Sequence, residues 1–403
     1  MAEQTLASGP GRTERRARAG VALVFATNGL VFANVLPRYP EIKAALGLTN
    51  AWFGAAVAAF PFGALVAGLA AGTLVARFRS SRVATFGMAA IGVGIVLVSS
   101  ASNGALLAAA MFLAGASDAI VDVAQNAHGL RVQRRYGRSI LNSFHAAWSV
   151  GAVLGGLMGA AAAGLAVPLS LHLGLSSVLS AAVAIGVYRL LLPGPEDAER
   201  APETDDPPAS RRPWAGLTPR MLLLLLAFGV IANSGTLVED SGQTWAAIYL
   251  EGSLGAAAAT AGLGFVALQG LQFVGRMTGD RLVDRFGQRA VARAGGLLVA
   301  LGMGLALAFP SIPGTIGGFG LAGLGVATLV PAAMSAADAL PGLAPGAGLT
   351  IVTWLMRVGF LVSPPVVGVI ADATSLRAGL LVVPLCGVVV LALAGVLARR
   401  VSR

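Results

Sequence analysis

Charged residues are scarce in this chain of 403 residues, because only 11% are Asp, Glu, Lys or Arg. Ordinary globular proteins carry about 25% charged residues, so the composition is not typical of a soluble domain. The single cysteine, Cys386, lies in an apolar run, which excludes a disulfide framework and a cysteine-rich metal site. We expect the protein to use neither a metal nor a cofactor.

Several functional motifs are also missing. The chain has no Walker-type glycine loop followed by lysine, which argues against ATP-driven transport by this chain. It has no HExxH motif and no Ser/His/Asp context, so we do not expect an enzyme. A channel would need a continuous polar path, whereas the polar residues within the apolar segments are sparse and clustered.

Apolar segments dominate the sequence, which is 56% hydrophobic with a mean hydropathy of +0.79. Because about 20 apolar residues span a bilayer core as a helix, each long segment is a candidate membrane span. The first is interpreted as an uncleaved helix and not a signal peptide, since further spans follow at once. The expected spans are 20–37, 51–75, 83–100, 104–127, 140–165, 169–192, 219–238, 257–277, 291–309, 314–336, 348–371 and 377–398.

The spans predict an all-α membrane protein with 12 transmembrane helices in two six-helix pseudo-repeats around a central cavity. The expected parts are an N-terminal tail (1–19), a first bundle (20–192), a linker rich in proline and acid (193–213), a second bundle (214–398) and a C-terminal tail (399–403). Parallel repeats of this kind build transporters whose substrate site lies between the halves.

Arginine placement predicts the orientation of the spans. With the N-terminus in the cytoplasm, almost every basic loop falls inside, and only Arg38, Lys43 and Arg377 fall outside. Both tails and the linker are then cytoplasmic in a multi-pass protein of the cell membrane. This distribution accounts for the formal net charge of +10 without a nucleic-acid partner. The lipid bilayer is the expected surrounding of the apolar helices.

Two basic loops, after the second and eighth spans, carry related residues. The second loop has Leu282, Asp284, Arg285, Phe286, Gly287 and Arg289, and the first has Gly72, Leu74, Arg77 and Arg82. In these loops the sequence resembles the major facilitator superfamily, and the resemblance extends over essentially the whole chain. The first loop departs from the family pattern, with Ala76 for aspartate and Arg79 for glycine. The segment 122–151 also resembles a bacterial subgroup that includes the rhizopine-transport type of permease.

The aspartate of the second loop, Asp284, predicts a cytoplasmic gate that it forms with Arg77 and Arg285. The resemblance implies that spans 5 and 8 are neighbours, so we expect Asp284 to contact the start of span 5 at Ser139–Asn142, together with Arg138. An acid accepts hydrogen bonds well from the unpaired amides of a helix N-terminus. The alternative is that Asp284 only neutralises local arginines.

Acids inside the apolar segments are costly and therefore informative. Asp118, Asp122 and Gln125 share one face of span 4. An unpaired acid in a low-dielectric environment takes up a proton, so Asp118 and Asp122 are candidate proton carriers, with a permanently protonated structural acid as the alternative.

Two more acids lie near the expected outer end of span 7, where Gly235 and Gly242 predict a broken helix. Glu239 is the third proton-coupling candidate, and we interpret Asp240 as an ordinary loop acid.

Other polar and aromatic side chains are candidates for lining a substrate cavity. His145 is either a proton-binding group or a satisfied hydrogen-bonding residue. Arg357 keeps its charge and therefore needs an anionic partner or substrate. With Asp118, the candidate lining residues are Asn28, Asn142, His145, Trp148, Asn233, Gln269, Gln272, Trp354 and Arg357.

Together these patterns favour a monomeric secondary active transporter that moves a small polar organic solute by alternating access and is coupled to protons. One alternative is a proton-driven efflux antiporter for drugs or secondary metabolites. That alternative loses weight because the family's antiporter signature has a glycine-proline pair, whereas Gly155 is followed by Gly156. A solute sensor with a permease fold that does not transport is the alternative from another class.

Overall fold

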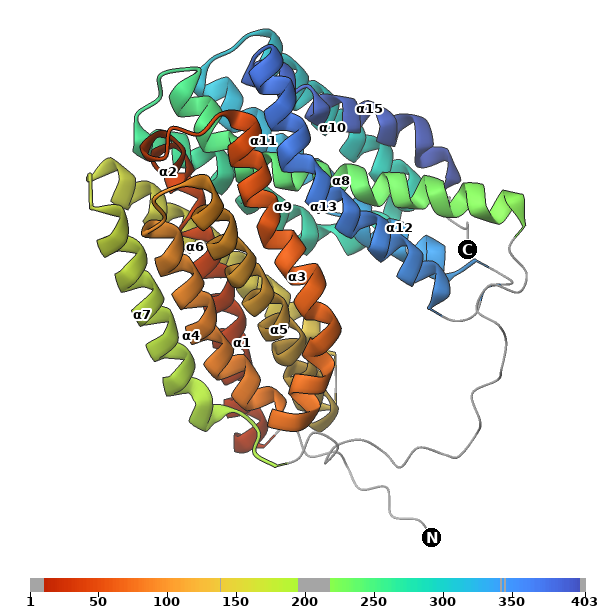
Figure 1. Cartoon of the computed structure of the whole chain (residues 1–403). Coiled ribbons are helices and arrows are strands. Elements are labelled where there is room, and N and C mark those ends of the chain that lie inside the picture. Colours follow the sequence, from red (N-terminus) through yellow and green to blue (C-terminus); the bar gives the residue numbers. More distant parts are fainter. Residues whose placement is uncertain (1–10, 138, 195–217, 341–342, 344–345, 399–403) are drawn as a thin grey trace.

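A computed structural model of the chain describes residues 11–137, 139–194, 218–340, 343 and 346–398. Every regular element among them is an α-helix or a short 3-10 helix (Figure 1). The N-terminal half contains α1 (Arg12–Ala33), η1 (Leu36–Arg38), α2 (Tyr39–Ala45), α3 (Asn50–Phe78), α4 (Ser80–Ser99), α5 (Gly104–Tyr136), α6 (Leu141–Gly164), α7 (Leu169–Val187) and η2 (Tyr188–Leu190). The C-terminal half contains α8 (Pro219–Gly252), α9 (Ala258–Phe286), α10 (Gln288–Ala308), α11 (Ile312–Val326), α12 (Leu329–Asp338), α13 (Ala347–Ala373), α14 (Leu376–Gly379), α15 (Val382–Leu393) and η3 (Ala394–Val396).

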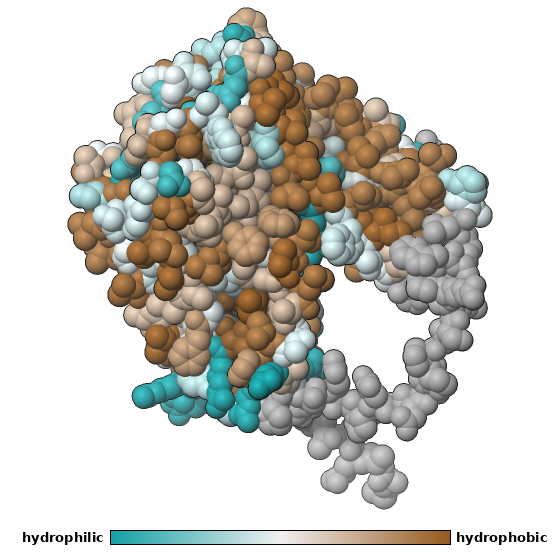
Figure 2. All heavy atoms as spheres, viewed as in Figure 1, coloured by the Kyte–Doolittle hydropathy of each residue, from teal (hydrophilic) through white to brown (hydrophobic). Residues whose placement is uncertain are grey.

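These helices form 12 segments long and apolar enough to cross a membrane within the described ranges, six in each half. The predicted fold class is therefore confirmed. Large hydrophobic side chains cover the outer surfaces of the bundles, as expected for helices that face lipid (Figure 2). Helix α1 begins at Arg12, before the expected start of its span at residue 20. Most of the expected linker lies outside the described residues.

One expectation about span 7 is wrong. Helix α8 runs unbroken through Gly235 and Gly242, so Glu239 and Asp240 lie inside the helix and not near its end. Asp240 is buried and is not a loop acid. Both glycines serve packing, because a Cβ at Gly242 would collide with Leu268 and one at Gly235 would touch Val330. Without competing water, a membrane helix tolerates glycine.

The two bundles meet at one end and diverge towards the other (Figure 1). We call the end that contains α2, the start of α3 and the end of α13 the closed end, and the opposite end the open end. Helix α3 packs on α13 and α6 packs on α9. Small residues permit this, since Gly54 faces the Pro364 carbonyl and Gly368 faces the Asn50 carbonyl too closely for any side chain.

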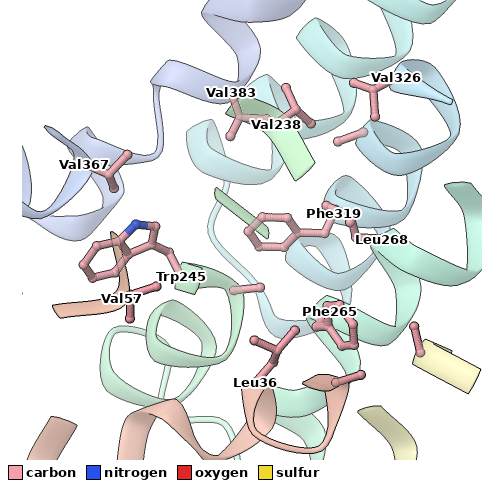
Figure 3. Close-up of a cluster of buried hydrophobic side chains, with 14 of the residues drawn as sticks. Leu36, Val57, Val238, Trp245, Phe265, Leu268, Phe319, Val326, Val367 and Val383 are labelled. Carbon is pink, nitrogen blue, oxygen red and sulfur yellow. The ribbon is translucent and has the colours of Figure 1, made fainter. Parts of the chain in front are cut away.

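Aromatic side chains from both halves fill the closed end. Trp245 on α8 is completely buried and packs edge-on against Phe53 on α3, with ring centroids 6.0 Å apart. Phe53 in turn contacts Tyr39 at 5.2 Å. In Figure 3, Trp245 lies beside Val57 and Val367, which belong to opposite halves. Burial of this much apolar surface holds the halves together at the closed end.

The internal repeat is visible in the backbone at the open end. The turn between α3 and α4 is at Arg79 (φ 76°, ψ 141°), and the turn between α9 and α10 is at Gly287 (φ 82°, ψ 154°). In both loops an arginine, Arg77 or Arg285, lies over the ring of the next phenylalanine. Arg79 therefore adopts a conformation that glycine adopts with less strain.

Candidate functional site

The space between the diverging bundles is hollowed at the open end, and we call it the inter-bundle cleft (Figure 2). Five of the residues predicted to line the cavity or to carry protons have exposed side chains. These are Asp122, Asn142, His145, Trp354 and Arg357. They come from α5, α6 and α13, so both halves contribute polar or aromatic groups.

A hydrogen-bonded chain joins three helices of the N-terminal half. The Asn28 amide on α1 donates to Asp118 Oδ1 on α5 at 2.8 Å, and Asn28 Oδ1 accepts from the Trp148 indole N–H on α6 at 2.8 Å. The structure therefore brings three predicted site residues into one network. Close contact between α1 and α6 makes this possible, because Gly151 and Gly155 face backbone carbonyls of α1 and Gly159 faces the carbonyl of the next residue, Asn34. Glycine therefore lets these two helix backbones approach each other closely.

Asp122 lies one turn from Asp118 towards the open end of α5. Its carboxylate accepts hydrogen bonds from the amides of Gln125 (3.2 Å) and Asn126 (3.0 Å). His145 packs edge-on against the Phe25 ring at 5.3 Å.

A second polar network belongs to the C-terminal half. Glu239 on α8 accepts hydrogen bonds from Gln272 at 2.8 Å and from Gln243 at 3.3 Å. Arg276, one turn beyond Gln272 on α9, forms an ion pair with Glu239 at 3.5 Å. Glu239 and Gln272 were predicted site residues, whereas Gln243 was not identified because it lies beyond the expected end of span 7.

The remaining candidates of the C-terminal half are separate from this network. Arg357 lies over the Trp354 ring at 5.9 Å, which is cation–π geometry, and approaches Gly68 of the opposite half. Asn233 packs tightly against Gly359. Gln269 is completely buried, and neither of its amide atoms has a hydrogen-bond partner.

The predicted gate residues Arg77, Asp284 and Arg285 are all exposed at the open end. In this state the first amides of α6, those of Ile140 and Leu141, are bonded to Gln133 of the same half at 2.9 and 3.1 Å. The expected contact of Asp284 with the start of span 5 stays a prediction. Arg138 lies outside the described residues.

Sequence reasoning missed an acid at the closed end. Asp372, near the end of α13, accepts hydrogen bonds from the backbone N–H groups of Asn50 (2.9 Å) and Ala51 (2.8 Å) and from the Asn50 amide (2.9 Å). The carboxylate therefore caps the N-terminus of α3 from the opposite half. An acid at the end of one span and unpaired amides at the start of another are the signals that were available.

Two buried histidines were also missed, and both serve packing. His128 hydrogen-bonds Ser80 at 2.8 Å and the Leu192 backbone N–H at 3.0 Å, and His172 hydrogen-bonds Asn34 at 2.9 Å. They join helices within the N-terminal half. In the described part of the chain, no three His, Cys, Asp or Glu side chains gather as a metal site would require.

Two six-helix bundles that meet at one end and diverge at the other, with 12 candidate membrane spans among the described residues, form the fold of a multi-pass membrane transporter (Figure 1). The chain matches the model of the Major Facilitator Superfamily over residues 21–239 and 240–403. The protein belongs to this family, as the loop motifs predicted.

Curated relatives and solved structures agree with this assignment. The chain is 30% identical to an uncharacterized transporter, y4wD, of Sinorhizobium fredii over 94% of this chain and 97% of that protein. It is also 30% identical to the membrane protein MosC of Rhizobium meliloti over 92% and 87% of the respective chains. The nucleoside transporter NupG has the same fold with a TM-score of 0.71 at 10% identity, covering 96% of this chain and 99% of NupG. An inward-facing, occupied bacterial homolog of the lysosomal transporter Spinster also has a TM-score of 0.71, at 14% identity over 96% and 97% of the two chains.

Proposed function

We propose that this protein is a secondary active transporter that moves a small polar organic solute across the cell membrane by alternating access, coupled to protons. The observation that carries the proposal is the pair of polar networks, Asn28–Asp118–Trp148 in one half and Glu239–Gln272–Arg276 in the other. Polar groups are costly inside a bilayer and usually mark a substrate or ion pathway.

The solute proposed has several hydroxyl or amide groups. The amides of Asn142, Asn233, Gln269 and Gln272 each offer a donor and an acceptor. Trp148 and Trp354 offer apolar faces for a ring. Arg357 favours an anionic group on the solute, since a guanidinium keeps its charge in every state of the protein.

Proton coupling is assigned to Asp118, Asp122 and Glu239, whose carboxylates accept hydrogen bonds from neighbouring side-chain amides. In the proposed cycle the closed end faces the outside and the open end, with both termini, faces the cytoplasm. Arg77, Asp284 and Arg285 then form the cytoplasmic gate when the open end closes. The proposed active form is a monomer, and no enzymatic activity is proposed.

A ligand-stabilisation screen tests the solute class. Sugars, polyols, nucleosides, amino acids and organic acids are added to purified protein, and a bound solute raises the apparent melting temperature. We expect Gln272→Leu to abolish this shift and Asp280→Asn, an exposed acid at the open end, to retain it. A response confined to large apolar cations would instead favour a drug antiporter.

Flux in proteoliposomes then tests coupling. We expect an inward proton gradient to accelerate uptake of the solute found in the screen and Asp118→Asn to remove the acceleration. Flux that is the same with and without a pH gradient would contradict proton coupling. Binding without any flux would favour a sensor.

A further inference from the structure

An apolar groove lies on the outside of the C-terminal half, between the closed-end parts of α10 and α11. It encloses about 480 Å³, and every residue that lines it is Gly, Ala, Leu or Phe. Leu301, Leu305 and Phe309 of α10 are more than half exposed beside it. Because large apolar side chains on the outside of a membrane bundle face lipid, the groove opens towards the bilayer and not towards the inter-bundle cleft.

Glycines on α11 leave the space that forms the groove. The internal repeat seen in the two basic loops aligns Gly314 with Leu106 and Gly317 with Ala109, so the N-terminal half carries side chains at these positions. A Cβ added at Gly317 would have no atom within 4 Å. The groove therefore has room for an apolar chain that the protein itself does not supply.

A guanidinium lies at the closed-end mouth of this groove. Arg377 of α14 is exposed and donates a hydrogen bond from Nη2 to the Ala308 carbonyl at 3.1 Å. Ala308 is the last residue of α10, and the next residue, Phe309, lines the groove. Arg377 forms no ion pair with a carboxylate among the residues that the structure describes. Its remaining N–H donors can bind another acceptor.

The depth of the two features matches the layers of a bilayer. The groove follows the closed-end parts of two membrane spans, where acyl chains lie, and Arg377 lies where these spans end, at the level of the lipid headgroups. A guanidinium binds a phosphate through paired charge-assisted hydrogen bonds. A phospholipid carries both groups, an apolar chain and a phosphate, in this order along the membrane normal.

We propose that the groove between α10 and α11 is a binding site for a phospholipid of the leaflet at the closed end. One acyl chain lies between the helices, and the phosphate binds Arg377. All of these residues belong to the C-terminal half, so the site is separate from the inter-bundle cleft and goes beyond the proposed transport function.

Native mass spectrometry of the delipidated full chain tests the proposal by counting bound lipids. The protein in mild detergent is titrated with palmitoyl-oleoyl phosphatidylglycerol, and we expect one lipid to bind before all others. Gly317→Leu fills the groove without a collision and should abolish this first binding event. Gly174→Leu is the matched control, because Gly174 also faces open space but lies in the closed-end part of α7, away from the groove.

The phosphate contact is tested separately. Diacylglycerol with the same chains should bind about tenfold more weakly, and Arg377→Gln should weaken phosphatidylglycerol binding by a similar factor, since each loses a charge-assisted hydrogen bond. Arg377→Lys keeps the charge and should retain binding. Lys43→Gln removes a positive charge from the same end of the other half and should bind the lipid normally.

Equal affinities of the parent and Gly317→Leu, or of phosphatidylglycerol and diacylglycerol, would overturn the proposal. A dimer that is lost in Gly317→Leu would assign the groove to a second copy of this chain and would also overturn it. Melting temperatures without lipid show which variants are folded, and the comparison of the two lipids uses the parent protein alone. Because the readout is lipid binding to solute-free protein, an absence of solute flux would count against the proposed function and leave this inference standing.

Discussion

The contact between Asp372 and the start of α3 predicts that the protein favours the arrangement in which the two halves are joined at the closed end. Three hydrogen bonds from Asn50 and Ala51 converge on this one carboxylate. Asp372 lies in one half, and Asn50 and Ala51 lie in the other. The bonds must therefore break when the halves separate there. Removing the carboxylate should therefore increase the population of molecules in which the two halves are separated at the closed end.

The expected magnitude follows from helix capping. Loss of an N-cap acceptor costs about 0.5–2 kcal/mol, and the interaction of a charge with a helix terminus contributes about 0.3–1 kcal/mol. Because Asp372 is exposed, solvent screens its charge and the lower part of these ranges applies to the charge alone. Asp372→Asn keeps an acceptor oxygen and should cost about 0.3–1 kcal/mol. Asp372→Ala loses every bond and should cost about 1–2 kcal/mol, which is a roughly 5- to 30-fold change in the population ratio.

Spin labels at Ser102→Cys and Pro310→Cys measure this ratio in a Cys386→Ser background, since both positions are exposed in closed-end loops of opposite halves. We expect the fraction at the longer distance to increase in the order parent, Asp372→Asn, Asp372→Ala. Asp338→Ala is the matched control, because Asp338 accepts the Gly346 backbone N–H within a single half. Equal distance distributions for the parent and Asp372→Ala would refute the reasoning, as would an equal shift in the control.

Three further predictions concern the backbone, the helix packing and the cleft. Arg79→Gly should raise the melting temperature in detergent, because it relieves about 1–3 kcal/mol of backbone strain at φ 76°, and Gly287→Arg should lower it. A lower melting temperature for Arg79→Gly would contradict the strain argument. Gly54→Leu should prevent α3 from packing against Pro364 and lengthen the closed-end label distance, whereas Gly72→Leu, which faces open space on the same helix, should leave that distance unchanged. Asn28→Ala should leave Asp118 and the Trp148 N–H without their partner, which should cost about 1–3 kcal/mol of stability and weaken solute binding in the stabilisation screen. The control Thr27→Ala breaks only a hydrogen bond within α1 and should bind the solute normally.

The number and order of the membrane helices were predictable because apolar length is a local property of the chain. The twelve expected segments match the twelve helical spans of the described residues, although the end of span 7 was placed at 238 and α8 continues to Gly252. That error arose because Glu239, Asp240 and the nearby glycines resemble a loop when their packing partners are unknown.

The polar contacts were predictable only where they follow helix periodicity. Asp118 and Asp122 were identified from their spacing on one face of a span. The Asp372 contact depends on which helix ends meet, and Asn50 is far from Asp372 in the sequence. The strained turn at Arg79 was visible as a missing glycine in a repeated loop, and its conformation became clear only beside Gly287.

Solute counterflow in proteoliposomes tests the central claim most directly. Vesicles loaded with unlabelled solute from the stabilisation screen are diluted into labelled solute without any ion gradient. A transporter with alternating access accumulates label transiently, and this protein should do so, while Gln272→Leu should not. Solute binding with no transient accumulation in the parent protein would contradict the account.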